Sequence, residues 1–111
     1  MLHRTFEAEW QVIRPTIAGY LFARLGDHQI ADDLEQEIAV AAWEGRHRVA
    51  SDRSFAAWVM GIARHKVIDH FRHHGSGSWE LLPTDATSDL ETLALAEAER
   101  QQRRVQALRR C

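Results

Sequence analysis

The side chains with the greatest potential for chemistry in this sequence are histidines and carboxylates at helical spacing. Two sets recur at intervals of four residues: His65, Asp69 and His73, and then His70 and His74. Because residues four positions apart lie on the same face of a helix, such a pair can hold a zinc ion. Basic residues that would repel a cation flank both sets: Arg64, Lys66 and Arg72. We therefore interpret these positions as a solvated basic face and expect no metal site.

No other combination of residues predicts a catalytic site. The sequence contains no glycine-rich phosphate-binding loop, HExxH pair, serine nucleophile elbow or CxxC motif. Its single cysteine, Cys111, has no partner for a disulfide or a zinc site. At the last position of the chain, that thiol also lacks the electropositive, partly buried setting of a reactive cysteine. The sequence therefore predicts a protein that is not an enzyme and that uses no cofactor.

Length and composition restrict the remaining classes of protein. The chain has 111 residues, of which 45% are hydrophobic and 27% are charged, as in a single globular domain. No apolar run approaches the roughly 20 residues that span a bilayer. The first residues lead directly into acidic ones, which is not typical of a secretory signal. Together with the single cysteine, these features predict a cytoplasmic protein without a membrane partner.

Charge is distributed unevenly along the chain, although the net charge is only -2. Residues 27–44 contain no Lys or Arg, and their acidic residues are Asp27, Asp32, Asp33, Glu35, Glu37 and Glu44. Residues 45–79 contain most of the histidines, and their other basic residues are Arg46, Arg48, Arg53, Arg64, Lys66 and Arg72. Two such surfaces suit two kinds of partner, or they neutralise each other within one fold. The charges alone leave both alternatives open.

Apolar residues at intervals of three and four predict helices through most of the chain. In the first segment they are Trp10, Ile13, Ile17, Tyr20, Leu21 and Leu25. Pro15 predicts either a kink or a new helix start at this position, and Gly26 predicts the end of the helix. Asp27 can cap a second helix, which Gly45 ends. Its apolar positions are Ile30, Leu34, Ile38, Ala41 and Ala42, with Trp43 near its end.

A third long helix is predicted to start after Ser54 and to end at residues 73–75, following a loop over residues 47–53. Its apolar positions are Phe55, Trp58, Val59, Ile62, Ala63, Val67 and Phe71. The aromatic residues whose spacing predicts core packing are Trp10, Trp43, Phe55, Trp58 and Phe71. Base stacking is the less favoured alternative for them.

The last part of the chain has a different composition. Residues 76–88 are rich in Gly and Ser and predict a flexible linker, in which Trp79 is either a loose anchor or a partner contact. Residues 89–111 predict a helix with weakly spaced apolar positions: Leu90, Leu93, Ala94, Ala98, Val105 and Leu108. This helix either docks loosely or belongs to a connection whose partner lies elsewhere. The predicted fold is all-α, a compact bundle of three main helices within residues 1–75 plus this C-terminal helix.

Three strings in this chain resemble region 2 of the extracytoplasmic-function (ECF) group of bacterial sigma factors, within the sigma-70 family. Residues 31–37 (ADDLEQE), followed by Ala42 and Trp43, resemble the DLxQE core of that family's second helix. Residues 24–27 (RLGD) resemble the end of its first helix, and residues 54–72 resemble its promoter-facing helix. Each string alone is weakly specific, but their order, spacing and helical context agree over about residues 8–75.

The resemblance implies that the second helix binds core RNA polymerase, at the clamp coiled coil of the beta-prime subunit. The implied contact residues are Asp33, Gln36, Glu37 and Val40. Acidic and amide groups at these positions suit a basic partner surface.

The resemblance also implies that the third helix and the loop before it recognise and melt the promoter minus-ten element and hold a flipped base of the single-stranded non-template strand. The implied DNA-binding residues are Arg46, Arg48, Val49, Ser51, Arg53, Ile62, Arg64, His65, Lys66, Asp69 and Arg72. The basic residues among them attract phosphates, and a short loop can hold an unstacked base. Many relatives carry an aromatic and then a basic residue where this chain has Val49 and Ala50, so the identity of the base is not implied.

Other functions remain open. The second domain of the family, a helix-turn-helix that reads the minus-thirty-five element, has no counterpart here, so we expect an excised fragment rather than a natural short form. A helical protein-interaction module that binds an anti-sigma factor, without binding DNA, is the main alternative, and the near-neutral charge slightly favours it. A small metal-dependent enzyme is the least favoured. The ordered motifs favour the sigma-factor module.

Overall fold

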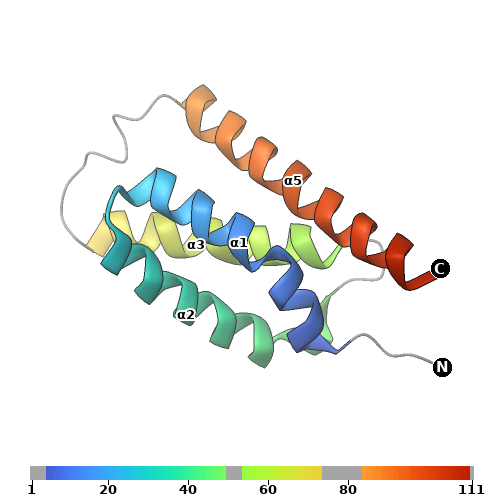
Figure 1. The fold of residues 1–111 in the computed structure, drawn as a ribbon. Helices are drawn as coiled ribbons and strands as arrows, with labels where there is room; N and C mark the ends of the chain where they lie inside the picture. The colour runs from blue at the N-terminus through green and yellow to red at the C-terminus, as the bar shows by residue number, and fades with distance from the viewer. Residues whose placement is uncertain (1–4, 50–53, 74–83, 111) are drawn as a thin grey trace.

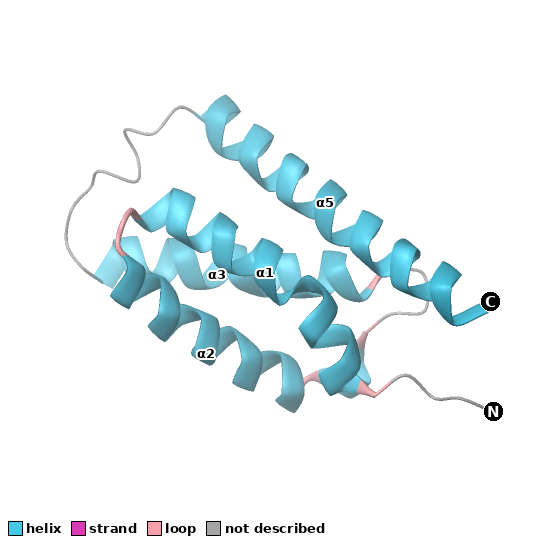
Figure 2. Ribbon diagram, viewed as in Figure 1, coloured by secondary structure: helices cyan, strands magenta, loops and turns pink. Residues whose placement is uncertain are grey.

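The computed structural model of the protein describes residues 5–49, 54–73 and 84–110, and in these residues every regular element is a helix. They are α1 (Phe6–Leu25), α2 (His28–Glu44), the 3₁₀ turn η1 (Arg46–Arg48), α3 (Phe55–His73) and α5 (Thr84–Arg110). The all-α prediction is therefore confirmed. Helices α1 and α3 form the middle of the bundle, with α2 on one side of them and α5 on the other (Figures 1 and 2).

Helix α1 runs without interruption through Pro15 and changes direction along its length, so the kink and not the new start is observed (Figure 1). Proline removes one helical hydrogen bond, the one to the carbonyl four residues earlier. Here the carbonyl left without an amide donor is that of Gln11. Both Gln11 and Pro15 are exposed, so water can bind this carbonyl instead.

The turn between α1 and α2 has the two caps that were predicted. Gly26 ends α1 with φ 70°, a left-handed conformation that glycine adopts without steric cost, and its N–H donates to the Phe22 carbonyl over 2.8 Å. Asp27 then caps α2, because its Oδ1 accepts from the Ile30 N–H over 3.0 Å. The two helices are joined at a defined angle by adjacent caps.

The connection from α2 to α3 differs partly from prediction. Gly45 ends α2 and Ser54 caps α3 as expected, with the Ser54 hydroxyl accepting from the Ala57 N–H over 3.0 Å. The predicted loop at 47–53 instead begins with η1, because the Arg48 N–H reaches back to the Gly45 carbonyl over 2.8 Å. A Cβ at Gly45 would lie 3.1 Å from the Trp58 ring, so glycine permits the close approach of α2 to α3. Residues 50–53 lie outside the described residues.

Helix α5 begins at Thr84, five residues before the expected start at 89. The linker boundary was wrong because Ser, Thr and Asp, which suggested a linker, are also favoured at helix starts. Of the two alternatives for this helix, docking is observed: Ala94 and Ala98 are 8% and 0% exposed against the core. The prediction that Leu93 and Leu108 lie on the apolar side of this helix is wrong, since these side chains are 68% and 69% exposed. Residues 76–83, with Trp79, and Cys111 lie outside the described residues.

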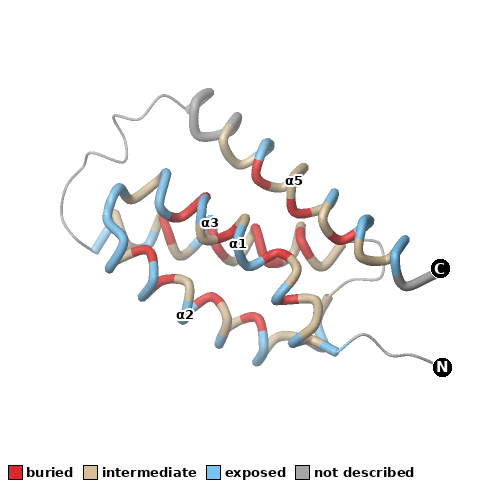
Figure 3. The backbone as a smooth tube through the Cα atoms, viewed as in Figure 1, coloured by how far each residue is buried: buried red, intermediate tan, exposed pale blue. Residues whose placement is uncertain are grey.

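The core lies along the facing sides of the four helices (Figure 3). Its large, fully buried side chains are Ile13, Ile17, Leu21, Ile38, Val59 and Val67. Trp10 is buried as expected, and Phe55, Trp58 and Phe71 are partly buried around the core. Trp43 is a correction: it is 49% exposed, because α2 turns Ala42 into the core at its last turn and leaves its neighbour outside.

The buried positions of α2 and α3 are otherwise shifted by one residue in places. Ala31 of α2 is buried while Ile30 is partly buried, and Ala56 and Met60 of α3 join the core although their spacing did not mark them.

Among the helices of the described residues, none combines the length and apolarity required to cross a membrane.

Candidate functional site

One open groove, of about 510 Å³, runs along the exposed side of α2. It contains all the residues expected to contact the polymerase, Asp33, Gln36, Glu37 and Val40, together with Ala41, Glu44 and Lys66. The four expected residues are exposed, and Val40 is 56% exposed although it is apolar. The structure therefore brings these side chains together on one accessible surface.

The groove faces solvent because the opposite side of α2 is anchored in the core. The buried residues of this helix are Ala31, Leu34, Ile38 and Ala42, spaced at three and four residues. Gln29 on the first turn donates from its Nε2 to Asp33 Oδ1 over 3.2 Å. This contact places the Asp33 carboxylate at one end of the groove.

An ion pair crosses the groove from α3 to α2. Lys66 Nζ lies 3.5 Å from Glu37 Oε1, with the side chains 33% and 56% exposed. Lys66, which was expected at the DNA surface, also lines the acidic groove. Exposed pairs of this kind contribute at most about 1 kcal/mol and exchange partners readily. A competing charged partner can therefore separate Lys66 from Glu37.

Three consecutive residues of α3 have three different environments, because successive residues of a helix are rotated by about 100°. Arg64 meets α5, where its Nε lies 3.3 Å from Glu91 Oε1. Lys66 meets α2, and His65 between them is exposed.

Two other expected DNA-binding residues, Ile62 and Asp69, lie on the same side of α3 as His65 by their spacing. Ile62 is partly buried and Asp69 is exposed. Arg72, one further turn along, is exposed.

The expected DNA-binding residues before α3 are only partly described. Arg46 and Arg48 lie on η1, next to the partly exposed Val49. The Arg46 guanidinium lies over the Trp43 ring at 3.5 Å and donates from Nη1 to the Trp43 carbonyl over 2.7 Å. Sequence reasoning missed Trp43 as a surface residue, because its spacing matched that of core aromatics. Ser51 and Arg53 lie outside the described residues.

The described histidines of the two sets have separate environments. Within residues 5–49, 54–73 and 84–110, no group of three His, Cys, Asp or Glu side chains could hold a metal ion. His73 Nδ1 lies 2.8 Å from the Asp69 carbonyl, which can only accept, so this nitrogen donates and is occupied. His70 packs edge-on against Phe71 at 5.6 Å, and His74 lies outside the described residues.

Helix α5 supplies polar contacts to the start of α3 that periodicity could not reveal. Gln102 is 8% exposed, and its Oε1 accepts from the Ala56 N–H over 3.2 Å. Glu99 accepts from the Ser54 hydroxyl over 2.7 Å. The first turn of an α-helix has N–H groups without helical partners, and here a distant helix satisfies one of them. A buried Gln has no hydrophobic signature, so no sequence signal marked it.

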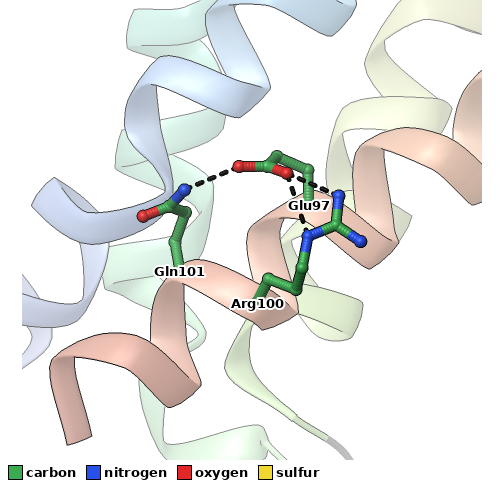
Figure 4. A network of polar contacts seen from close by, with 3 residues as sticks. All are labelled: Glu97, Arg100 and Gln101. Atoms are coloured by element: carbon green, nitrogen blue, oxygen red, sulfur yellow. Dashed lines mark hydrogen bonds and ion pairs between the residues drawn. The ribbon is translucent and has the colours of Figure 1, made fainter. Parts of the chain in front are cut away.

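Two titratable groups of the α1–α5 region have shifted pKa values. Burial raises the pKa of Tyr20 to about 12, and the nearby Glu91 carboxylate adds to the shift. The neutral phenol donates to Glu91 Oε1 over 3.5 Å. Within α5, hydrogen bonds from Gln101 and Arg100 lower the pKa of Glu97 (Figure 4).

The helical fold, the acidic groove and the adjoining basic turn lie in a part of the chain that matches a known protein family. The family model for sigma-70 region 2 matches residues 11–77, and the chain belongs to this family. The match covers most of α1 and all of α2, η1 and α3, so it includes the groove and the basic turn.

Individual proteins similar to this chain include two ECF RNA polymerase sigma factors. The ECF RNA polymerase sigma factor SigC of Mycobacterium tuberculosis is 43% identical over 51 residues, which is 46% of this chain and 28% of that protein. The ECF RNA polymerase sigma factor SigX of Bacillus subtilis is 28% identical over 71 residues, 64% of this chain and 37% of that protein. The matched segments therefore span about a third of these relatives. No solved structure matches the chain significantly.

Proposed function

We propose that this chain acts as region 2 of an ECF sigma factor in transcription initiation, binding core RNA polymerase and the single-stranded minus-ten element of the promoter. One observation carries the proposal: the residues that the family resemblance singles out on α2 line one exposed groove, and none of them has a role in the core. The proposal assigns the groove to the polymerase, and η1 with the exposed side of α3 to DNA.

Charge complementarity supports the assignment of the groove. The carboxylates of Asp33, Glu37 and Glu44 line it, and a basic surface such as a coiled coil rich in Lys or Arg is their natural partner. Gln36 can donate and accept hydrogen bonds at the middle of the groove. Val40 adds an exposed apolar contact. In this proposal the partner is the clamp coiled coil of the beta-prime subunit, and its basic side chains compete with Lys66 for Glu37.

The DNA side of the proposal rests on a different physical argument. Melting a promoter requires that bases leave the stack, which costs a few kcal/mol per nucleotide and is offset when the protein binds the extruded base. On α3, His65 and Asp69 are exposed beside the partly buried Ile62, so hydrogen-bonding groups lie next to an apolar contact. The arginines of η1 can hold the neighbouring phosphates.

Charge reversal in the groove tests the polymerase assignment. We expect Glu37→Lys to weaken retention of the chain by immobilised core RNA polymerase at least tenfold, because it opposes a basic partner and also repels Lys66. Asp32→Lys is the matched control: it makes the same charge change on an exposed residue of α2 that does not line the groove. Equal retention of both variants would show that the groove is not the polymerase site.

A second candidate function is a protein-interaction module, such as one that binds an anti-sigma factor, without contact to DNA. The observation that favours it is that two of the proposed phosphate ligands already have acidic partners in the fold: Arg64 with Glu91, and Lys66 with Glu37. In that function the acidic and basic segments serve mainly to stabilise the bundle. Binding of a single-stranded oligonucleotide separates the two candidates, since only the sigma module requires it.

A further inference from the structure

The end of α2 and the turn that follows it hold a planar cation against an aromatic ring. Arg46 Cζ lies 3.5 Å from the Trp43 ring centroid, closer than is usual for such pairs. The hydrogen bond from Arg46 Nη1 to the Trp43 carbonyl, 2.7 Å long, fixes the guanidinium in this position. We call these two residues the Trp43–Arg46 stack.

The ring that supports the cation is itself held in place. Phe6 packs edge-on against Trp43 with ring centroids 5.5 Å apart, and Phe6 in turn contacts the core. Even so, Trp43 is 49% exposed and Arg46 is partly exposed. Neither packing of the core nor the α2 groove explains the arrangement, because Trp43 is not buried and does not line that groove.

We infer that the Trp43–Arg46 stack is a preformed platform for one unstacked base of single-stranded DNA, which would lie on the guanidinium face opposite the indole. The inference rests on the proposed function and adds a binding position to it. Bases extruded from a strand stack on aromatic rings and on arginine planes, and arginine remains charged at all accessible pH values. The same guanidinium therefore offers a flat surface to the base and attraction to the strand.

Charge favours a nucleic acid over a protein as the occupant of this site. Arg46 shares η1 with His47 and Arg48, so this turn carries three basic residues and no acidic one, and the nearest carboxylate in the chain is Glu44 at the end of α2. The adjacent groove is acidic and suits a basic protein surface, which Arg46 would repel. A polyanionic strand is attracted by η1 and has flat bases to place on the platform.

The platform can be tested without removing its charge. Arg46→Lys keeps the positive charge but loses the plane, so we expect binding of a labelled single-stranded DNA oligonucleotide to weaken by roughly five- to tenfold, the effect of losing one stacked base. The slope of affinity against salt should stay the same, since the charge is retained. Arg104→Lys makes the same exchange on an exposed residue of α5, outside the proposed DNA surface, so it is the control and should change affinity less than about twofold.

Abasic oligonucleotides identify the stacked base. At one position, an abasic site should weaken binding of the parent chain by the same factor as Arg46→Lys, and it should have no further effect on that variant. Equal losses for parent and variant at every position, or an Arg46→Lys variant that binds like the parent, would overturn the inference while leaving the proposed function intact.

Two further measurements separate the remaining outcomes. If the parent chain binds no strand at all, the proposed DNA function fails, and the inference fails with it. Trp43→Ala should reduce strand binding like Arg46→Lys, with thermal unfolding used to show that the variant is folded. If both variants bind the strand normally but are no longer retained by core polymerase, the stack is a protein contact and the inference is wrong.

Discussion

Arg64, His65 and Lys66 show how much the direction of a side chain decides about its role. All three were expected to bind DNA, and they occupy adjacent positions on α3. Two of them form ion pairs with neighbouring helices, while His65 is exposed between them. A substitution at His65 therefore changes the surface of this turn and leaves the ion pairs of Arg64 and Lys66 with the neighbouring helices in place.

A comparison of two α3 variants tests this distinction. His65→Ala should change the free energy of unfolding by less than about 0.5 kcal/mol, as surface substitutions do, and should reduce affinity for a single-stranded minus-ten oligonucleotide. Trp58→Ala should cost a large part of the stability, although less than the about 3–5 kcal/mol of a fully buried tryptophan, because Trp58 is only partly buried. Urea unfolding measures both. Destabilisation of equal size would place His65 in the structural framework.

Helix α5 stabilises the bundle through a contact between elements far apart in the sequence. Ala94 and Ala98 allow its backbone to approach α1 and α3, and small residues bury little apolar area. Its polar contacts with Ser54 and Ala56 then align it with the start of α3. The stability of α3 therefore depends on a helix that lies beyond residues 74–83 in the chain.

Two adjacent glutamines of α5 provide a matched test. Gln102→Ala removes the acceptor for the buried Ala56 N–H, so we expect a loss of about 1–3 kcal/mol in the free energy of unfolding. Gln101→Ala removes a hydrogen bond to Glu97 within α5 between two partly exposed side chains, and we expect a smaller loss, of less than about 1 kcal/mol (Figure 4). Thermal unfolding of both variants is the measurement. Similar melting temperatures would mean that water replaces Gln102 and that this contact does not hold α5.

The whole molecule combines a net charge of -2 with strongly separated local charges. The acidic groove runs along α2 and the basic turn η1 follows the end of the same helix, so the two surfaces are adjacent and no residue of η1 lines the groove. Local potential rather than net charge attracts a partner at short range, because salt screens charges beyond about 10 Å. A near-neutral chain can therefore bind a strand through one surface.

Salt dependence tests this arrangement. Affinity for a single-stranded oligonucleotide should fall as ionic strength rises, with a log-log slope of about -0.7 for each phosphate contact. Arg48→Ala should reduce the magnitude of the slope by about one such contact, whereas Arg100→Ala, on the outer side of α5, should leave it unchanged. Fluorescence anisotropy over a range of salt concentrations provides the slopes. Binding that is independent of salt would favour the protein-interaction module.

The features that the sequence determined are those set by short-range chemistry. Gly26 and Asp27 define the α1–α2 turn and Ser54 caps α3, because these interactions involve residues at most four apart. The exposed set on α2 was also predictable, because a helix with a buried stripe must turn its other side to solvent. Residues 11–77 thus contain both the family resemblance and the signals for the fold.

Only the tertiary structure decided which of several similar residues became core, surface or contact. Trp10 and Trp43 have the same apolar spacing, yet one is 7% and the other 49% exposed, because burial depends on where neighbouring helices end. Gln102 acquired its role from the position of Ala56, and Lys66 from that of Glu37. Such pairings join residues far apart in the sequence, and local periodicity contains no information about which distant group will lie opposite a given side chain.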